Sequence, residues 1–384
     1  MSDTHTSAAA VARAGLIALA VAMGIGRFAF TPLLPMMQQD HGLSVVAGAW
    51  LASANYLGYL GGALAAIWMQ RQASGAIRIA LVAIGIVTIA MGATNGLVLW
   101  LLLRAAAGVA SAWVLIHASA WSLQRLATAR RPVLSGIVFG GVGAGIALAG
   151  GICLVLMHVK ASSAQAWIVL GVLSLAFTAV VWPIFSLDAG AEKTLPQTRG
   201  ALRWDRESLR LVLCYGVFGF GYIIPATFLP AMARQAIHAP LVFGWSWPIF
   251  GLAAMASTLV AAALPPSLSN RRLWIGSQFL MAIGVALPVV WPGISGIMLA
   301  ALLVGGTFMV TTMVAIREAR EVGGSNATAL IAAMTAAFAI GQIVGPISAS
   351  YLERNGDFSP ALLIASALLA VSACALRWPR RARH

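Results

Sequence analysis

The chain has 384 residues, of which 60% are hydrophobic and only 9% charged, and its mean hydropathy is +0.91. A soluble globule of this length does not need so much apolar surface, because burial is limited by its own core. The apolar runs are also far longer than the roughly 10-residue alternating segments of a membrane β-barrel. The composition therefore predicts an all-α membrane protein, whose helices each need about 20 apolar residues to cross a bilayer.

Polar and turn-forming residues divide the chain into twelve predicted membrane spans. The first continues past Arg27 without a cleavage site, so we expect it to be retained rather than removed as a signal peptide. The short breaks at Thr94–Gly96 and Trp291–Gly293 predict tight helix hairpins. The expected spans are 12–37, 44–69, 76–95, 97–124, 132–157, 164–186, 208–233, 240–264, 272–290, 292–316, 325–350 and 359–378.

The basic residues predict how these spans are oriented. With the N-terminus in the cytoplasm, nineteen Lys and Arg residues fall on the cytoplasmic side and only Lys160, Arg234 and Arg354 on the other. This positive-inside bias supports an even number of spans with both termini cytoplasmic, as in a bacterial inner-membrane protein. The same bias accounts for the net charge of +14, so we expect the lipid bilayer as a partner and no nucleic acid.

The two halves of the chain share sequence patterns. Segment 26–37 recurs 195 residues later at 221–232, with glycine, Leu-Pro and methionine at matching positions. The Gly-x-x-x-Gly pattern of 141–145 recurs 200 residues later at 341–345. Matching spacings in matching spans indicate a duplicated six-helix unit, which is a common plan among transporters.

The longest hydrophilic stretch, 188–207, separates the two repeats. We therefore predict two pseudo-symmetric six-helix bundles, at 1–187 and 208–384, joined by a cytoplasmic linker. Spans three, six, nine and twelve carry few polar residues and are expected to face lipid, while the other spans line a shared interior.

Arg27 lies near the middle of the first span, where a charge costs about 2.5 kcal/mol or more unless it faces a protein interior or water. None of the ten acidic residues lies in the middle of a span, so Arg27 and Arg104 have no expected carboxylate partner. A visiting anion or water in a cavity would relieve that deficit. Hydrogen bonds to helix carbonyls are the structural alternative.

A predicted substrate site follows from Arg27, because its fork of donors matches a carboxylate or phosphate. Asn55 and Tyr59 share a helix face, and Tyr222 is the repeat partner of Arg27. Thr311 is a further candidate, although threonines in spans often bond their own helix backbone. The predicted substrate-binding residues are Arg27, Asn55, Tyr59, Tyr222 and Thr311.

Several of these segments resemble the major facilitator superfamily. Gly24–Met37 is similar to its YbfB/YjiJ-like branch, and Leu57–Leu64 supports that resemblance. Arg104-Ala-Ala-Ala-Gly108 resembles the family's Arg-x-x-x-Gly motif in span four, which implies a coupling or gating role for Arg104. The glycine-rich face of span five resembles an antiporter motif but lacks the proline after Gly145. The loop at 69–75 lacks the aspartate of the family's usual charged signature.

Two further groups of residues have expected roles in motion. His117 is the only histidine deep in a span and is a candidate proton carrier, with simple hydrogen bonding of a buried histidine as the alternative. The residues expected to pack closely and to flex where the halves meet are Gly143, Gly145, Gly341, Gly345 and Pro346.

The expected function is alternating-access transport of a small carboxylate-bearing anion by a monomer, without cofactor or metal. Proton-coupled efflux of lipophilic or drug-like compounds is the alternative, and both facilitated exchange and coupling to protons stay open. A membrane enzyme is disfavoured, because HExxH, GxSxG and paired aspartates do not occur and the three cysteines lack metal-type spacing. A sensor is disfavoured because no loop is long enough for a soluble domain.

Overall fold

A computed structural model describes residues 7–68, 73–129, 134–186, 205–236, 244–264 and 268–377. Within these ranges the chain is helical and has no strand beyond an isolated bridge between Arg354 and Asp357. Ten of the described helices are long and apolar enough to cross a membrane. The prediction of an all-α, multi-pass membrane protein is therefore confirmed.

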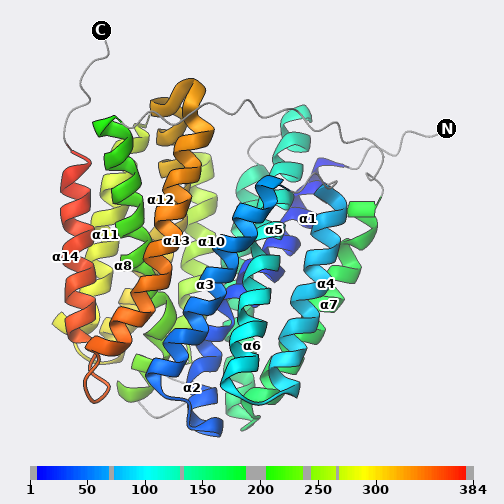
Figure 1. The fold of residues 1–384 in the computed structure, drawn as a ribbon, viewed down its shortest axis with the longest axis vertical. Helices are drawn as coiled ribbons and strands as arrows, with labels where there is room; N and C mark the ends of the chain where they lie inside the picture. Colours follow the sequence, from blue (N-terminus) through cyan, green and yellow to red (C-terminus); the bar gives the residue numbers. More distant parts are fainter. Residues whose placement is uncertain are drawn as a thin grey trace.

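The helices run side by side in one direction or its reverse (Figure 1). Their bounds are α1 (Ala8–Leu19), η1 (Ala20–Phe28), α2 (Phe30–His41), α3 (Val45–Trp68), α4 (Ala73–Ala93), α5 (Leu97–Thr128), α6 (Ser135–His158), α7 (Ser163–Ser186), α8 (Arg206–Ala236), α10 (Ser246–Ala263), α11 (Asn270–Val290), α12 (Ile294–Gly323), η3 (Gly324–Asn326), α13 (Ala327–Leu352) and α14 (Ser359–Ala375).

Every predicted span overlaps a helix, and the first span comprises three consecutive segments, α1, η1 and α2. The ten apolar helices do not include α3, or α14, which has 17 residues. A count of twelve membrane crossings thus stays a prediction.

The two tight hairpins are confirmed. Gly96 lies between α4 and α5 with a φ of 107°, and Gly293 lies between α11 and α12 with a φ of 105°. Backbone in this region strains an L-residue but not glycine. The short breaks therefore reverse the chain within a few residues.

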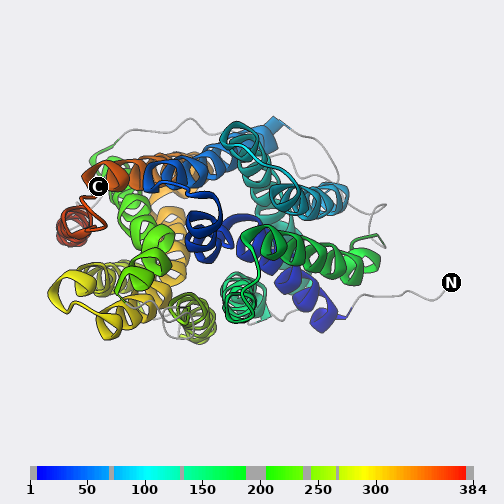
Figure 2. The same cartoon turned by 90° about the horizontal axis from the view of Figure 1, so that it is seen from below.

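Helices from the first half of the chain (blue to green) and from the second half (light green to red) gather on opposite sides in Figure 2. Three helix pairs join the sides, since α3 packs against α13, α6 packs against α10 and α2 packs against α8. The predicted division at 188–207 stays a prediction, because residues 187–204 lie outside the described part.

Close contact between α3 and α5 shows how glycine permits this packing. A Cβ atom on Gly58 would lie 2.0 Å from the carbonyl oxygen of Ala105, and one on Gly108 would lie 2.0 Å from that of Asn55. Small residues let helix backbones approach closely in membranes, where packing rather than hydrophobicity drives association. This contact fixes Asn55 beside α5.

Burial differs between the helices and follows the polar pattern in part. In its most apolar stretch α8 is 78% buried, whereas α7 and α11, spans six and nine, are each 33% buried. Spans six and nine therefore present more of their apolar side chains outward, whereas α4, span three, is 44% buried, the same share as α5 and α10.

Candidate functional site

Arg27 belongs to η1, a π-helical stretch between α1 and α2. In a π-helix the carbonyl of residue i pairs with the N–H of residue i+5, and the position five after Arg27 is Pro32, which has no N–H. The Arg27 carbonyl is thus left available to a side chain. Such π-helical stretches often occur at functional sites.

Arg104 on α5 supplies that side chain. Its Nη2 donates to the Arg27 carbonyl at 3.0 Å and its Nη1 to the Gly26 carbonyl at 3.3 Å. Asn55 Nδ2 on α3 donates to the same Gly26 carbonyl at 3.3 Å and to the Arg104 carbonyl at 2.9 Å. Arg104 and Asn55 therefore hold η1 against α3 and α5, and Arg104, only 2% exposed, has carbonyl acceptors in place of an ion pair.

The Arg27 guanidinium itself contacts helices from both halves of the chain. Its Nη2 donates to Gln342 Oε1 of α13 at 2.5 Å, and Gln342 Nε2 donates to the hydroxyl of Tyr222 on α8. On the other side it lies over the rings of Tyr59 and Tyr56, at 4.3 and 5.1 Å from their centroids. An amide and aromatic rings thus surround the charge.

The charge of Arg27 has no carboxylate partner among the described residues. The residue is buried, with 3% of its surface exposed. No acceptor there lies within hydrogen-bonding distance of its Nε atom. A buried cation is costly unless it is paired, so the surroundings leave Arg27 with unused capacity to bind an anion.

Further hydrogen bonds join the same two groups of helices close to Arg27. Thr31 Oγ1 donates to the Ala226 carbonyl at 2.7 Å, an acceptor that is available because Pro230 cannot donate to it within α8. Ser53 Oγ donates to the Ile343 carbonyl at 2.8 Å.

Two more polar contacts extend this seam. The Tyr56 hydroxyl lies 3.3 Å from Thr227 Oγ1, and Arg234 donates to the Pro35 carbonyl. The first contact joins α3 to α8, and the second joins α2 to the last turn of α8, at the end of the molecule away from the start of α1 in Figure 1.

Aromatic rings form the wall beside Gln342. The ring of Tyr222 stacks on Phe218, Phe308 and Phe338, with centroid separations of 5.2, 5.6 and 5.6 Å. Phe308 also contacts Phe28, the residue after Arg27, at 6.3 Å. The Arg27 side chain therefore lies among a few neutral polar groups and a large apolar surface.

A family model described as an uncharacterised MFS-type transporter, YbfB, matches residues 19–377. The chain belongs to this family. Comparison with curated proteins gives no match. Membership confirms the resemblance seen in the sequence and makes the protein a membrane transporter of the major facilitator superfamily in general terms.

The structure brings four of the five predicted substrate-binding residues of this MFS-type transporter together. Asn55 donates to the backbone of η1, and the Tyr59 ring lies beside the Arg27 guanidinium. Tyr222 accepts from Gln342, which in turn accepts from Arg27. The fifth residue, Thr311, lies one turn after Phe308 on α12 and is fully buried. Its hydroxyl has no hydrogen-bond partner among the described residues.

Gln342 was not among the predicted substrate-binding residues. It is fully buried on α13 and is the only group described that bonds both Arg27 and Tyr222. A polar side chain in the middle of a span was its signal. Tyr56, whose ring and hydroxyl both contact the site, had the same signal.

His117 lies apart from this group. It is half-buried on α5, thirteen residues beyond Arg104, which is about 20 Å along the helix axis at 1.5 Å per residue. Its predicted part in proton coupling therefore does not include contact with Arg27.

The glycines pack closely, but only one lies where the halves meet. A Cβ atom on Gly143 of α6 would lie 2.3 Å from the Met255 nitrogen of α10. Gly145 instead faces Ala20 of η1, while Gly341 and Gly345 of α13 face α8, so each packs within one half of the chain.

The expectation that these three glycines mark the meeting of the halves is therefore wrong. Small residues indicate close helix contact, but they do not say which helix is the partner. Pro346 is buried in α13 and removes the N–H that would bond the Gln342 carbonyl.

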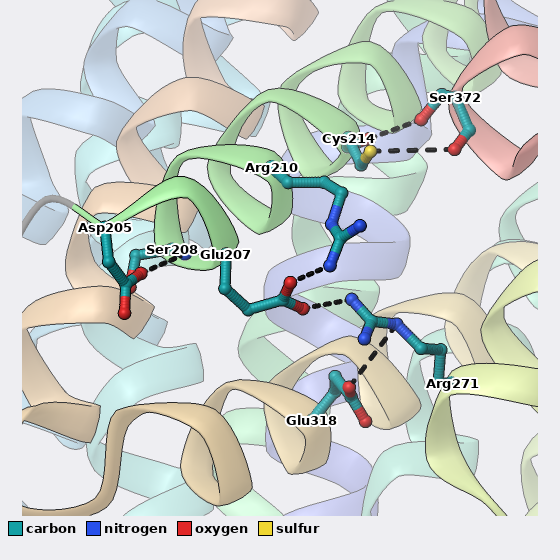
Figure 3. Close-up of polar contacts among 8 residues, drawn as sticks. All are labelled: Asp205, Glu207, Ser208, Arg210, Cys214, Arg271, Glu318 and Ser372. Atoms are coloured by element: carbon teal, nitrogen blue, oxygen red, sulfur yellow. Dashed lines mark hydrogen bonds and ion pairs between the residues drawn. The ribbon is translucent and has the colours of Figure 1, made fainter. Parts of the chain in front are cut away.

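An ionic network lies at the end of the bundle where α8 begins (Figure 3). Glu207 accepts from Arg210 and from Arg271, and Arg271 Nε lies 3.7 Å from the buried Glu318 carboxylate. These contacts tie the starts of α8 and α11 to the end of α12. The loop at 69–75, which lacks the aspartate of the family's charged signature, falls mainly outside the described residues.

Proposed function

We propose that the protein transports a small carboxylate-bearing organic anion by alternating access between two six-helix bundles. Arg27 is the observation that carries this proposal. Among the described residues, the partners of its buried guanidinium are all neutral, and they belong to helices of both halves. A carboxylate would match its donors in geometry and would offset the cost of the buried charge.

Gln342 supplies a route from binding to motion. Its Oε1 atom accepts from Arg27 while its Nε2 atom donates to Tyr222, so the amide links η1 to α13 and α8. A ligand carboxylate competes for the same Arg27 donors and releases this link. Binding then weakens a contact that holds the two halves together, as a transporter requires when it changes state.

Efflux of lipophilic compounds is the second candidate, favoured by the stacked rings of Tyr222, Phe218, Phe308 and Phe338. A large aromatic wall suits an apolar passenger. The buried positive charge of Arg27 disfavours a cation and favours an apolar molecule that also carries a carboxylate.

A thermal-shift panel tests the proposal on the purified full chain. The panel contains aliphatic and aromatic carboxylates, their uncharged amides, and lipophilic amines. A ligand present at 100 times its Kd stabilises the folded protein by about 2.7 kcal/mol. We expect stabilisation by at least one carboxylate and none by its amide, whereas stabilisation by amines alone would reject the anion hypothesis in favour of efflux.

Arg27→Gln provides the site-specific arm of this experiment. Hydrogen bonds to charged groups contribute about 1.5–3 kcal/mol each, so the variant should bind the selected anion at least 10-fold more weakly. Arg78→Gln is the matched control, because Arg78 lies over Trp182 on the outer helices α4 and α7. Wild-type affinity in Arg27→Gln would remove Arg27 from the site.

A further inference from the structure

A second basic site lies away from Arg27, between α11 and α14. A cavity of about 500 Å³ opens there at the end of the bundle where α11 begins, and its lining includes Arg271, Arg272 and Arg377. The same lining contains the Ser269 hydroxyl and the apolar side chains of Ile275, Phe279 and Leu376. The cavity therefore has a cationic mouth and an apolar wall.

Two of its arginines are available to a ligand. Arg272 and Arg377 are exposed, and no carboxylate in the described part of the chain forms an ion pair with either. The Arg377 guanidinium lies over the Phe279 ring at 5.1 Å, which holds it above the apolar wall. Arg271 pairs with Glu207 and Glu318 instead, so its charge is largely balanced (Figure 3).

The two helices that line the cavity also carry exposed apolar side chains. Leu280 and Ile283 of α11 are 48% and 54% exposed, and Leu368 and Val371 of α14 are 40% and 66% exposed. We refer to these exposed apolar side chains of the two packed helices as the apolar strip. In a multi-pass membrane protein such an exposed apolar strip faces acyl chains.

We propose that this cavity binds the headgroup of an anionic phospholipid. The phosphate lies between Arg272 and Arg377, the Ser269 hydroxyl donates to it, and the acyl chains follow the apolar strip. Basic pockets between membrane helices suit such headgroups, and the first turn of α11 adds the positive end of its helix dipole. A free phosphate would use the arginines but leave the apolar strip without a role.

The site also touches the ionic network at the start of α8. Because Arg271 lines the cavity and donates to Glu207, a bound headgroup lies directly beside the contacts that tie α8, α11 and α12 together. Occupancy should therefore raise the stability of this end of the bundle.

Thermal unfolding and native mass spectrometry of the full chain in detergent test the proposal. Phosphatidylglycerol, phosphatidylcholine with the same acyl chains, and glycerol 3-phosphate are titrated separately. We expect stabilisation and retained lipid adducts with phosphatidylglycerol only. Equal effects of phosphatidylcholine would overturn the role of charge, and equal effects of glycerol 3-phosphate would overturn the assignment to a lipid.

Variants then locate the site. Arg272→Gln with Arg377→Gln should weaken phosphatidylglycerol binding about 30-fold, since each basic residue near an anionic headgroup contributes about 1 kcal/mol and 1.4 kcal/mol is tenfold. Arg317→Gln with Arg320→Gln removes the same charge from exposed positions on α12 and should leave binding unchanged. Equal loss in both pairs would show that total charge, not this cavity, attracts the lipid.

Gly276 offers a test that keeps every arginine. A Cβ atom at Gly276 meets no atom within 4 Å, so the cavity reaches the backbone of α11 there. Gly276→Leu fills that space and suits a helix better than glycine does, so the fold should be kept. Undiminished binding of phosphatidylglycerol to this variant would reject the cavity as the lipid site.

Discussion

Replacing Gln342 by glutamate would place a carboxylate where an amide now accepts from Arg27. The side chain keeps its shape, and the Nη2–Oε1 distance in the structure is 2.5 Å. With charge centres about 4 Å apart, the attraction is about 4 kcal/mol at an effective dielectric constant of 20. Burying the new carboxylate costs several kcal/mol, so the free energy of unfolding should change little.

The affinity for an anion should change far more than the stability. A ligand carboxylate must displace the internal one, and losing the full 4 kcal/mol would weaken binding by about 10³-fold. If screening halves the attraction, the loss is still about 30-fold. Gln342→Glu is therefore expected to bind the carboxylate selected by the thermal-shift panel at least about 30-fold more weakly than the wild type.

Isothermal titration calorimetry on purified protein measures this loss, with Gln342→Met as the matched control. Methionine keeps the volume but has no amide to compete for Arg27, so this variant should bind the anion at least as tightly as the wild type. Wild-type affinity in Gln342→Glu would show that a carboxylate at this position does not compete with the anion for Arg27. An equal loss in both variants would also contradict the prediction, because the amide and not the charge would then control binding.

Three other predictions concern stability and topology. Gly108→Val should lower the unfolding temperature, because a Cβ atom there meets the α3 backbone at 2.0 Å and overpacking costs about 1–3 kcal/mol. Gly61→Ala is the control and should leave the unfolding temperature unchanged, because its Cβ atom meets open space. Arg104→Met should reduce thermal stability by about 3 kcal/mol or more through two lost hydrogen bonds from a charged donor, and unchanged unfolding would contradict its support of η1. In a cysteine-free background, an impermeant maleimide applied to intact cells should label Ser162→Cys but not Arg320→Cys, and the reverse pattern would invert the predicted orientation.

The sequence was sufficient for the features that depend on local chemistry. Apolar runs gave the helices, and glycine with proline at Gly96 and Pro292 gave the tight hairpins. Helix ends were less accurate, since α12 continues to Gly323 and its predicted span ends at 316. An apolar run ends where charged residues begin, but a helix can continue beyond the membrane when its further side chains are polar.

Contacts between distant segments could not be read in the same way. Gln342 is separated from Arg27 by 315 residues, and only the packing of α13 against α3 and α8 brings its amide to η1. The pairing of Gly145 with Ala20 was missed for the same reason, because a small residue permits close approach without naming its partner. The π-helical stretch had a visible cause in Pro32 but no periodicity to reveal it.

Arg104 and Arg27 are both buried, but their hydrogen-bond partners differ in kind, so we expect a structural role for Arg104 and a ligand-binding role for Arg27. Arg104 donates to two backbone carbonyls, acceptors that cannot leave without unfolding η1. Arg27 donates to a side-chain amide, which can rotate away. Its release breaks a few hydrogen bonds but leaves the helices folded. A permanent ion pair at Arg27 would hold the halves together too strongly for an anion to compete. In the proposed mechanism a neutral amide keeps the charge buried without ligand and yields to a carboxylate, so the lack of an acidic partner among the described residues is the property that suits Arg27 to reversible binding.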